Sequence, residues 1–408
     1  MADQTTLGAT TAAGISVAEP GATDRLAGPG TGRATSPPGD VRAQRVRSSD
    51  PDAFGRPTGR EEEWRFTPLR RLGGLLDGAP SDAQLSWKHE LPGGVEVVTL
   101  SAGDVAAAEL PRPADYLAAV ALRESGGAVV VRVPRGASYD EPLVLRLHGT
   151  GDDAPVWGHV VLDIGAQAQA TVVLEHTGSA RYAAVVSVVV GDAAVLDLVS
   201  AQLWDDDAVH VAHHAIRLGR DAQLRSAQVS MGGDLVRITE TVDMPATGAD
   251  AQLSGLLFAD AGQHLEHRLF VDHQQPHCKS RVNYKAALQG EGAHSVWVGD
   301  VLIGKHAVGT DTYEINRNLV LTDGARADSV PNLEIETGEI TGAGHASATG
   351  RFDDLQLFYL MARGIPADEA RRLVVRGFFA EIIGQITVTD LRDRLLAAVD
   401  AELERSVI

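Results

Sequence analysis

The sequence predicts a mainly β protein in which short strands stack in coils to form a β-helix, with helical segments at both ends. Alternating apolar and polar residues, the pattern of strands, run from about residue 128 to 350. Apolar residues make up 44% of the chain, but aromatics only 5%, and 43 glycines supply many tight turns. This composition favours thin, layered coils over a globular helical bundle.

A short motif, Gly-x-x-Ala, recurs inside the alternating region and opens a strand-like segment. Subtracting the numbers of successive glycines gives spacings of 26, 28, 29, 42 and 34, for copies at Gly165, Gly191, Gly219, Gly248, Gly290 and Gly324. Such periods are typical of solenoids and propellers. We interpret each glycine as a corner at positive φ and each alanine as an interior residue. Chance recurrence is the alternative, disfavoured by the strand pattern after nearly every copy.

Four segments are expected along the chain. Residues 1–50 are rich in Ala, Thr, Gly and Pro without an apolar period, which predicts a disordered tail. Residues 51–126 form a mixed region, anchored by Trp64 and containing a helix that ends before Gly126. Residues 127–350 are the β-helix core, since no helical pattern interrupts the strands.

The last segment, residues 351–408, is predicted to be a helical domain. One helix begins at Asp353-Asp354 and ends at Gly364, a second follows Pro366, and Thr389 caps a third. A domain of about sixty residues is too small to be stable without docking on the solenoid or on a partner.

Charge and composition exclude several classes of function. The formal charge is −19, so phosphate backbones and anionic membranes would be repelled, and we expect no nucleic-acid or membrane partner. A single cysteine excludes intrachain disulfides and zinc sites built on paired cysteines. With no apolar run of membrane-spanning length and no secretory leader, we expect a cytoplasmic location. Gly304-Lys305-His306 lacks the rest of a phosphate-binding loop, so the chain should not hydrolyse ATP by itself.

Histidines and the cysteine are the remaining candidates for chemistry. His210 and His214 should share one face of a strand while His213 faces away. Neither this group nor the group of His273, His277 and Cys278 offers the four ligands of a structural zinc site. Solvated or locally hydrogen-bonded imidazoles are therefore favoured for the first group. For Cys278, an inert buried thiol and a functional thiol are both open.

A histidine near the end of the alternating region receives more weight. Gly342-Ala343-Gly344-His345 resembles a further copy of the repeated motif, in which His345 would stand at the position of the alanine. The sequence motifs around His345, rather than the imidazole alone, indicate a function.

Several motifs in this neighbourhood resemble the SufD proteins of the SufB/SufD family, which serves the bacterial SUF system of iron–sulfur cluster assembly. The motifs are Ser329-Val330-Pro331-Asn332-Leu333-Glu334-Ile335, Gly344-His345-Ala346-Ser347-Ala348-Thr349-Gly350-Arg351, the run from Leu355 to Ile365, and Glu63-Trp64-Arg65-Phe66-Thr67-Pro68-Leu69. Together they cover most of the chain after residue 50, and the run from Pro331 to Ile365 is quite specific.

This resemblance implies a right-handed parallel β-helix between helical parts, acting as a non-catalytic scaffold. The family's subunit pairs with its paralogue SufB through the β-helix and is engaged at its C-terminal helices by the ATPase SufC, giving a SufBCD complex. ATP hydrolysis is then expected from SufC. A homodimer is a possible state of the isolated chain.

The resemblance also implies site residues. By motif, the family's interface histidine falls on His345, a suitable iron ligand facing SufB, with Cys278 as a further candidate. An iron–sulfur cluster would be held there only transiently, and no cofactor is expected on the chain alone. Pro331, Asn332 and Glu334 are expected at the interface. The expected residues for docking SufC are Phe378, Phe379 and Ile383, which as an alternative simply pack on the solenoid.

Two departures from relatives bear on this assignment. Ala343 stands where some relatives carry a cysteine, which excludes a thiolate at that position. Ala346 follows the histidine where SufB carries a glutamate, which favours the SufD branch.

Two other functions fit a repetitive β chain. A β-helix enzyme that cleaves polysaccharides would use clustered carboxylates along one face, but the chain shows no secretion signal and few aromatics for sugar stacking. A hexapeptide-repeat acyltransferase would need a six-residue period, which the sequence lacks.

Overall fold

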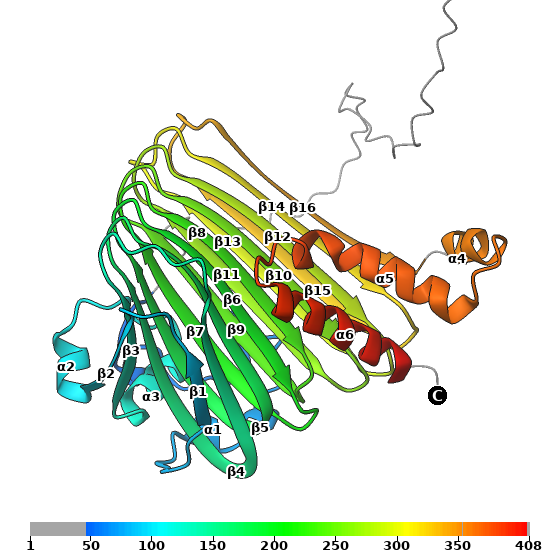
Figure 1. The fold of residues 1–408 in the computed structure, drawn as a ribbon, viewed down its shortest axis with the longest axis horizontal. Helices are drawn as coiled ribbons and strands as arrows, with labels where there is room; N and C mark the ends of the chain where they lie inside the picture. Colours follow the sequence, from blue (N-terminus) through cyan, green and yellow to red (C-terminus); the bar gives the residue numbers. More distant parts are fainter. Residues whose placement is uncertain (1–45, 353, 406–408) are drawn as a thin grey trace, which may run out of the picture. The chain divides into compact units, whose positions relative to one another are not determined.

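Two ladders of parallel strands face each other and form a solenoid (Figure 1). The structure is a computed structural model, and it describes residues 46–352 and 354–405. These residues belong to one unit, Arg45–Ile408. The first ladder consists of β6 (Val195–Trp204), β8 (Gln223–Met231), β10 (Asp250–Ala259), β12 (Lys279–Leu288), β14 (Asp311–Val320) and β16 (Gly342–Arg351). The second consists of β7 (Val209–Leu218), β9 (Leu235–Met244), β11 (His264–His273), β13 (His294–Ile303) and β15 (Arg326–Ile335).

The two ladders meet in the long strands β4 (Leu143–Ile164) and β5 (Gln169–Val190), which pair with each other in parallel. The first half of β5 pairs with β6 and its second half with β7, so the chain then alternates between the ladders. Every later pair is parallel, and the predicted parallel β solenoid is confirmed. Its interior holds a continuous apolar core of Val, Leu and Ala side chains.

The N-terminal part closes the first coil and covers part of one outer face. It contains η1 (Pro51–Ala53), η2 (Leu69–Leu72), α1 (Gly74–Asp77), β1 (Ser86–Glu90), β2 (Glu96–Ser101), α2 (Ala102–Ala107), α3 (Tyr116–Glu124) and β3 (Gly127–Val133). β1 pairs antiparallel with β4, and β2 with β3. The predicted helix at 115–124 is confirmed, because the carboxylate of Asp115 accepts a hydrogen bond from the Ala118 amide at 2.8 Å and caps α3.

Three C-terminal helices follow the solenoid: α4 (Asp354–Met361), α5 (Ala367–Ile383) and α6 (Thr389–Arg405). Figure 1 shows α5 and α6, coloured orange to red, beside the strands of the first ladder. Their apolar sides bury Phe379, Ile383 and Leu395 against Val229 and Phe258 on the outer face of that ladder. Buried polar groups also take part in this contact, among them Lys285, whose ammonium donates to the Phe378 carbonyl at 2.8 Å. The start of the first predicted helix, Asp353, lies outside the described residues.

The repeated glycines have two structural roles, only one of which the sequence predicted. Gly248 adopts φ +81°, as expected of a corner. Gly191, by contrast, has no positive φ, yet a Cβ there would lie 2.6 Å from the Ala166 backbone nitrogen of the preceding coil. The expectation of positive φ is therefore wrong for this copy, and equally for Gly165 and Gly219, where close stacking of the coils requires glycine.

The interpretation of His345 as a replaced repeat alanine is also wrong. In the register of the first ladder, corner alanines Ala168, Ala194 and Ala222 stack above Ala249 and Cys278. His345 instead lies opposite Glu314, in a row of interior-facing residues three positions into the strands. The alanine of the fourth copy, Ala251, lies two residues past the corner position of Ala249, and the fifth and sixth copies open strands of the second ladder, so the motif does not follow the register of one ladder.

The predicted tail of residues 1–50 lies mostly outside the described residues.

Candidate functional site

The solenoid ends at β15 and β16, which are the last strands of the two ladders. Each of them pairs with one preceding strand, β15 with β13 and β16 with β14. His345 lies on β16 with its side chain exposed, and Cα register places it directly opposite Glu314. Because neighbouring residues of a parallel ladder point to the same face, both side chains start toward the interior of the final coil.

Glu314 is unusual because its carboxyl group is buried without a partner. The residue is 1% exposed, and neither Oε1 nor Oε2 has a hydrogen-bond partner among the described residues. A Cβ atom on Gly299 of β13 would lie 2.8 Å from Oε1, so the carboxyl group reaches across the coil to the opposite ladder. Burial, with a smaller effect from the charge of Asp300, raises the pKa of Glu314 to about 8.

The two asparagines that follow Glu314 along β14, Asn316 and Asn318, are hydrogen-bonded to the neighbouring strands. The Asn316 amide oxygen accepts from Ser329 Oγ at 2.6 Å and from Ser347 Oγ at 3.2 Å. Asn318 Nδ2 donates to Ser329 Oγ at 2.8 Å and to Thr349 Oγ1 at 2.9 Å. These bonds tie β14, β15 and β16 together at the end of the solenoid.

The predicted interface residues lie on β15. Pro331, Asn332 and Glu334 are half-buried, and Asn332 Nδ2 donates to Asp300 Oδ1 at 2.6 Å. A proline lacks the N–H that a further strand would need, and it is tolerated in the last strand of a ladder. The structure thus places these residues on the same final coil as His345, and their role at an interface stays a prediction.

Cys278 does not join His345. It lies at the corner before β12, two strands away from β16, in the stack of small corner residues. The thiol is buried and donates to the Ala246 carbonyl at 3.3 Å, and burial raises its pKa. This surrounding is typical of an inert thiol.

The histidine group of β7 is divided as predicted but is not solvated. His210 and His214 face the solenoid interior and His213 faces outward, and all three are buried. His214 Nδ1 pairs with Gln228 at 3.0 Å and His213 Nε2 with Thr241 at 3.1 Å. Burial lowers the pKa of both imidazoles to about 3, so they are neutral structural groups.

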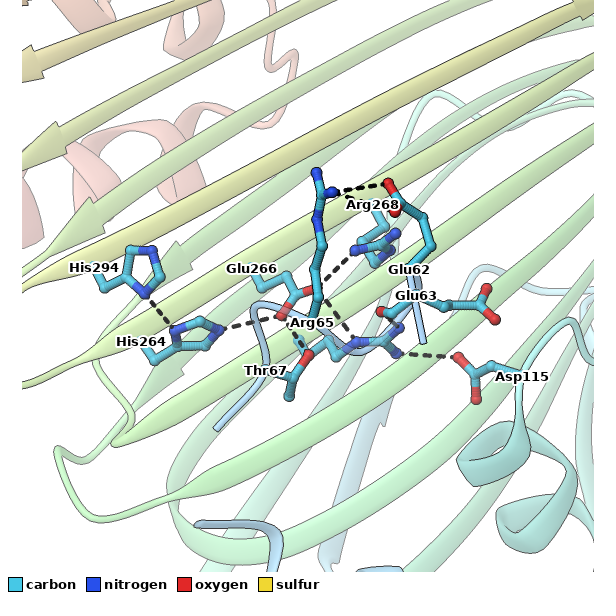
Figure 2. A network of polar contacts seen from close by, with 10 residues as sticks. Glu62, Glu63, Arg65, Thr67, Asp115, His264, Glu266, Arg268 and His294 are labelled. Carbon is cyan, nitrogen blue, oxygen red and sulfur yellow. Dashed lines mark hydrogen bonds and ion pairs between the residues drawn. The ribbon is translucent and has the colours of Figure 1, made fainter. Parts of the chain in front are cut away.

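A buried polar network that sequence reasoning missed joins the N-terminal region to the second ladder (Figure 2). Arg237 Nη1 lies 3.1 Å from an oxygen of Asp115, and Arg237 Nε lies 3.5 Å from Glu266 Oε1. Thr67 donates to Glu266 at 2.7 Å, and the Arg237 guanidinium stacks 3.9 Å from the Trp64 ring centre. Trp64 and Thr67 belong to the motif of residues 63–69, and this motif was the one feature of the sequence that could have pointed to the network.

The same network reaches the final coil. His264 Nε2 lies 3.2 Å from Glu266, the two Nδ1 atoms of His264 and His294 are 3.1 Å apart, and His294 Nε2 lies 2.7 Å from Asp328 on β15. Because Glu266 is held by two arginines and His264, its pKa lies far below the usual range despite its burial. This series of polar contacts, which runs from Thr67 to Asp328, therefore fixes the N-terminal segment relative to the strand at the solenoid end.

The residues predicted to dock the ATPase lie on α5 with different exposure. Phe379 and Ile383 are buried against the first ladder, and Phe378 is half-buried. The exposed apolar side chains lie elsewhere on α4 and α5: Phe358 (70%), Tyr359 (55%), Met361 (46%) and Leu373 (43%). The packing alternative accounts for Phe379 and Ile383, while their docking role stays a prediction.

The described residues contain neither a complete metal site nor a membrane helix. Within 46–352 and 354–405, His, Cys, Asp and Glu side chains never gather in threes around a position for a metal ion. Over the same ranges, every helix is too short or too polar to cross a membrane.

Comparisons with known proteins agree with the motifs at the solenoid end. The sequence profile described as "SUF system FeS cluster assembly, SufBD core domain" matches residues 147–378, more than half of the chain. An iron–sulfur cluster assembly SufBD family protein of Mycobacterium bovis is 54% identical over 366 residues, covering 88% of this chain and 92% of that protein.

More distant relatives carry the SufD name. The iron–sulfur cluster assembly protein SufD of Escherichia coli is 27% identical over 282 residues, covering 67% of this chain and 66% of its own length. The SufD protein of Bacillus subtilis is 34% identical over 120 residues, or 29% of this chain and 27% of its own length. These matches give no support to a polysaccharide enzyme. This chain belongs to the SufBD family of the SUF system, and its role lies in iron–sulfur cluster assembly.

Proposed function

We propose that this chain is a non-catalytic scaffold subunit of a cytoplasmic SufBCD complex. It pairs with a SufB paralogue through the final coil of its solenoid and with the SufC ATPase through its C-terminal helices. The observation that carries the proposal is the final strand β16, which presents an exposed His345 and, within the part of the chain that the structure describes, pairs with β14 alone. A strand with one free side is suited to pairing with another chain.

His345 is proposed as this chain's contribution to the site at which the cluster is assembled. A neutral imidazole binds iron, and its exposure at the solenoid end leaves it accessible to ligands of a partner. The cluster is the product of the assembly and passes on, so the chain alone needs no resident cofactor.

Co-expression with the paralogue and the ATPase tests this role. We expect the three proteins to co-purify, and we expect His345→Ala to fold normally but to lower the cluster yield of the complex. The matched control is His306→Ala, since His306 is also exposed but lies at a corner away from β16. Unchanged yield in the His345 variant would contradict the assignment, as would a chain that binds neither partner.

The ATPase surface is proposed to lie on the exposed apolar side chains of α4 and α5. Deleting the helices would bare the face of the first ladder that they bury, so a surface variant is the sharper test. We expect the double substitution Phe358→Ser with Tyr359→Ser to abolish ATPase binding and to leave pairing with the paralogue intact. Val97→Ser with Val98→Ser removes two exposed apolar residues of β2 and should bind the ATPase normally.

A further inference from the structure

Among the residues that the structure describes, Glu314 is the one whose buried carboxyl group lacks a hydrogen-bond partner at both oxygens, and Trp297 lies close to it. The carboxyl oxygens of Glu314 and the indole Nε1 of Trp297 are buried, and among the described residues none of these atoms has a hydrogen-bond partner. Both groups lie at Gly299, where an added Cβ would contact the Trp297 ring and the Glu314 carboxyl group. The glycine therefore keeps space at the carboxyl group that any other residue would fill.

The missing partners do not result from a general shortage of polar groups at this end. Asn316 and Asn318, two and four residues further along the same strand, are bonded to serine and threonine side chains of β15 and β16. A buried polar group without a partner destabilises the folded chain by about 1–3 kcal/mol. A carboxyl group retained under this penalty is placed for something that arrives from outside the chain.

His345 lies on the side from which a ligand would arrive. It is the register neighbour of Glu314 on β16, and it is exposed while Glu314 is buried. Adjacent strands of a ladder lie about 4.8 Å apart. A metal ion bound in tetrahedral geometry by one oxygen and one nitrogen at about 2.1 Å each holds the two donor atoms about 3.4 Å apart. Side chains that start about 4.8 Å apart on the same face of a ladder can bring their donor atoms to this separation.

We propose that Glu314 and His345 together form this chain's half of a site for a divalent transition-metal ion, with Glu314 as the inner ligand. One carboxylate oxygen and one imidazole nitrogen suit Fe²⁺, Mn²⁺, Co²⁺ or Zn²⁺ better than Mg²⁺ or Ca²⁺, which prefer oxygen ligands alone. The remaining coordination positions of the ion face out of the solenoid end, toward water or a partner chain. The inference deepens the proposed role of His345 and rests on it for the identity of the ion as iron.

Binding of Co²⁺ to the purified full-length chain tests the site without any cluster. Co²⁺ is titrated into the protein in a buffer without chelators, with visible absorption and heat as the two readouts. We expect one ion to bind, and we expect Glu314→Gln and His345→Ala each to raise the Kd by at least about tenfold, since loss of a group supporting a metal already has this effect. The matched control, Glu336→Gln, removes an exposed carboxylate after β15 and should bind Co²⁺ like the wild type.

Folding of each variant is followed by thermal unfolding before titration. Glu314→Asp is a second variant that keeps the carboxyl group but shortens its reach, and it should also bind Co²⁺ more weakly. Wild-type affinity in folded Glu314→Gln or Glu314→Asp, or no Co²⁺ binding by the wild-type chain at millimolar concentration, overturns the proposal. If His345→Ala alone lowers both Co²⁺ affinity and cluster yield, the role of Glu314 is wrong while the proposed function stands. If both variants lose Co²⁺ but give normal cluster yield, the metal site stands and the function fails.

Discussion

Two buried glutamates, Glu240 in the middle of the solenoid and Glu314 at its end, occupy opposite kinds of environment. The carboxyl group of Glu240 accepts hydrogen bonds from Ser226 at 2.5 Å, Gln228 at 3.3 Å and Tyr284 at 3.4 Å. The carboxyl group of Glu314 is equally buried and has no such partner among the described residues. In both cases burial is the main cause of a raised pKa.

The difference shows that one solenoid uses interior polar groups for two purposes. In the middle coils, the carboxyl group of Glu240 is bonded to Ser226, Gln228 and Tyr284, and these bonds link strands of successive coils. In the final coil, the carboxyl group of Glu314 has no hydrogen-bond partner among the described residues, although Asn316 and Asn318 on the same strand are bonded. Four measurements follow from this contrast, because closed networks should be costly to disturb and the open group should not.

Acid should have the largest effect, because the closed networks contain buried neutral imidazoles. Burial lowers the folded-state pKa to about 4 or about 3, below the unfolded value near 6.5, so the unfolded chain binds more protons in this window. Stability should therefore fall as the pH falls from 6.5 toward 4, by about 2 kcal/mol per imidazole at pH 5. The folded-state pKa is about 4 for His159, His176 and His273, and about 3 for His213, His214 and His267.

Urea unfolding at a series of pH values measures this loss. His213→Asn should reduce the steepness of the profile by about one proton. A profile that is flat between pH 6.5 and 5 would contradict neutral buried imidazoles.

Disrupting the network of Figure 2 should have the next largest effect. Arg237→Met leaves the buried carboxylate of Asp115 without its guanidinium and removes one of the two that face Glu266, which should lower the free energy of unfolding by about 3–5 kcal/mol. Limited proteolysis should then cut the segment around Trp64 more readily. Arg132→Met removes an exposed ion pair with Asp163 and should change stability by less than about 1 kcal/mol. Equal effects of the two substitutions would refute the structural role of the network.

Substitutions of the two glutamates test the contrast directly. Glu240→Ala removes the acceptor of three buried donors and leaves a cavity, so we expect a loss of about 2–4 kcal/mol in urea unfolding. A loss below about 1 kcal/mol would mean that the closed network contributes little to stability.

Glu314→Gln should have the smallest effect and the opposite sign. The folded-state pKa of about 8 lies above that of the unfolded chain, so wild-type stability falls as the pH rises from about 4.5 to 8. The amide removes this dependence, and we expect the variant to be more stable by about 1–3 kcal/mol at pH 7 and equal to the wild type near pH 4.5. Destabilisation at pH 7 would show that the Glu314 carboxyl group has a partner in the free chain.

Much of the fold could be predicted from the sequence because its strongest signals are local. Alternation marked the strands, and the changes of period at α3 and after β16 marked the helices. Gly191 shows the limit of local reasoning, since its glycine is required by the coil below and not by its own φ. The misplacement of His345 has the same origin, because the register between coils depends on corner lengths that change along the chain.

The candidate site was only partly accessible to sequence reasoning. His345 and Pro331 were found through motifs, but Glu314 lies outside these motifs and becomes notable only when its buried, unpaired state is known. The network around Arg237 joins residues more than one hundred positions apart, as for Arg237 and Asp115, and no local pattern reports such a contact. Which residues of α5 are exposed for docking depends on which side of the helix faces the ladder. The amphipathic pattern of the helix did not decide this orientation.

The position of Cys278 limits how sulfur can be handled at the solenoid end. The chain has one cysteine, and its thiol is enclosed in the stack of corner residues, two strands from β16. No thiol of this sequence can therefore accept a persulfide at His345 or bridge to an incoming sulfide there. In the proposed assembly, this chain would supply nitrogen and oxygen donors, and the sulfur donors would come from its partners.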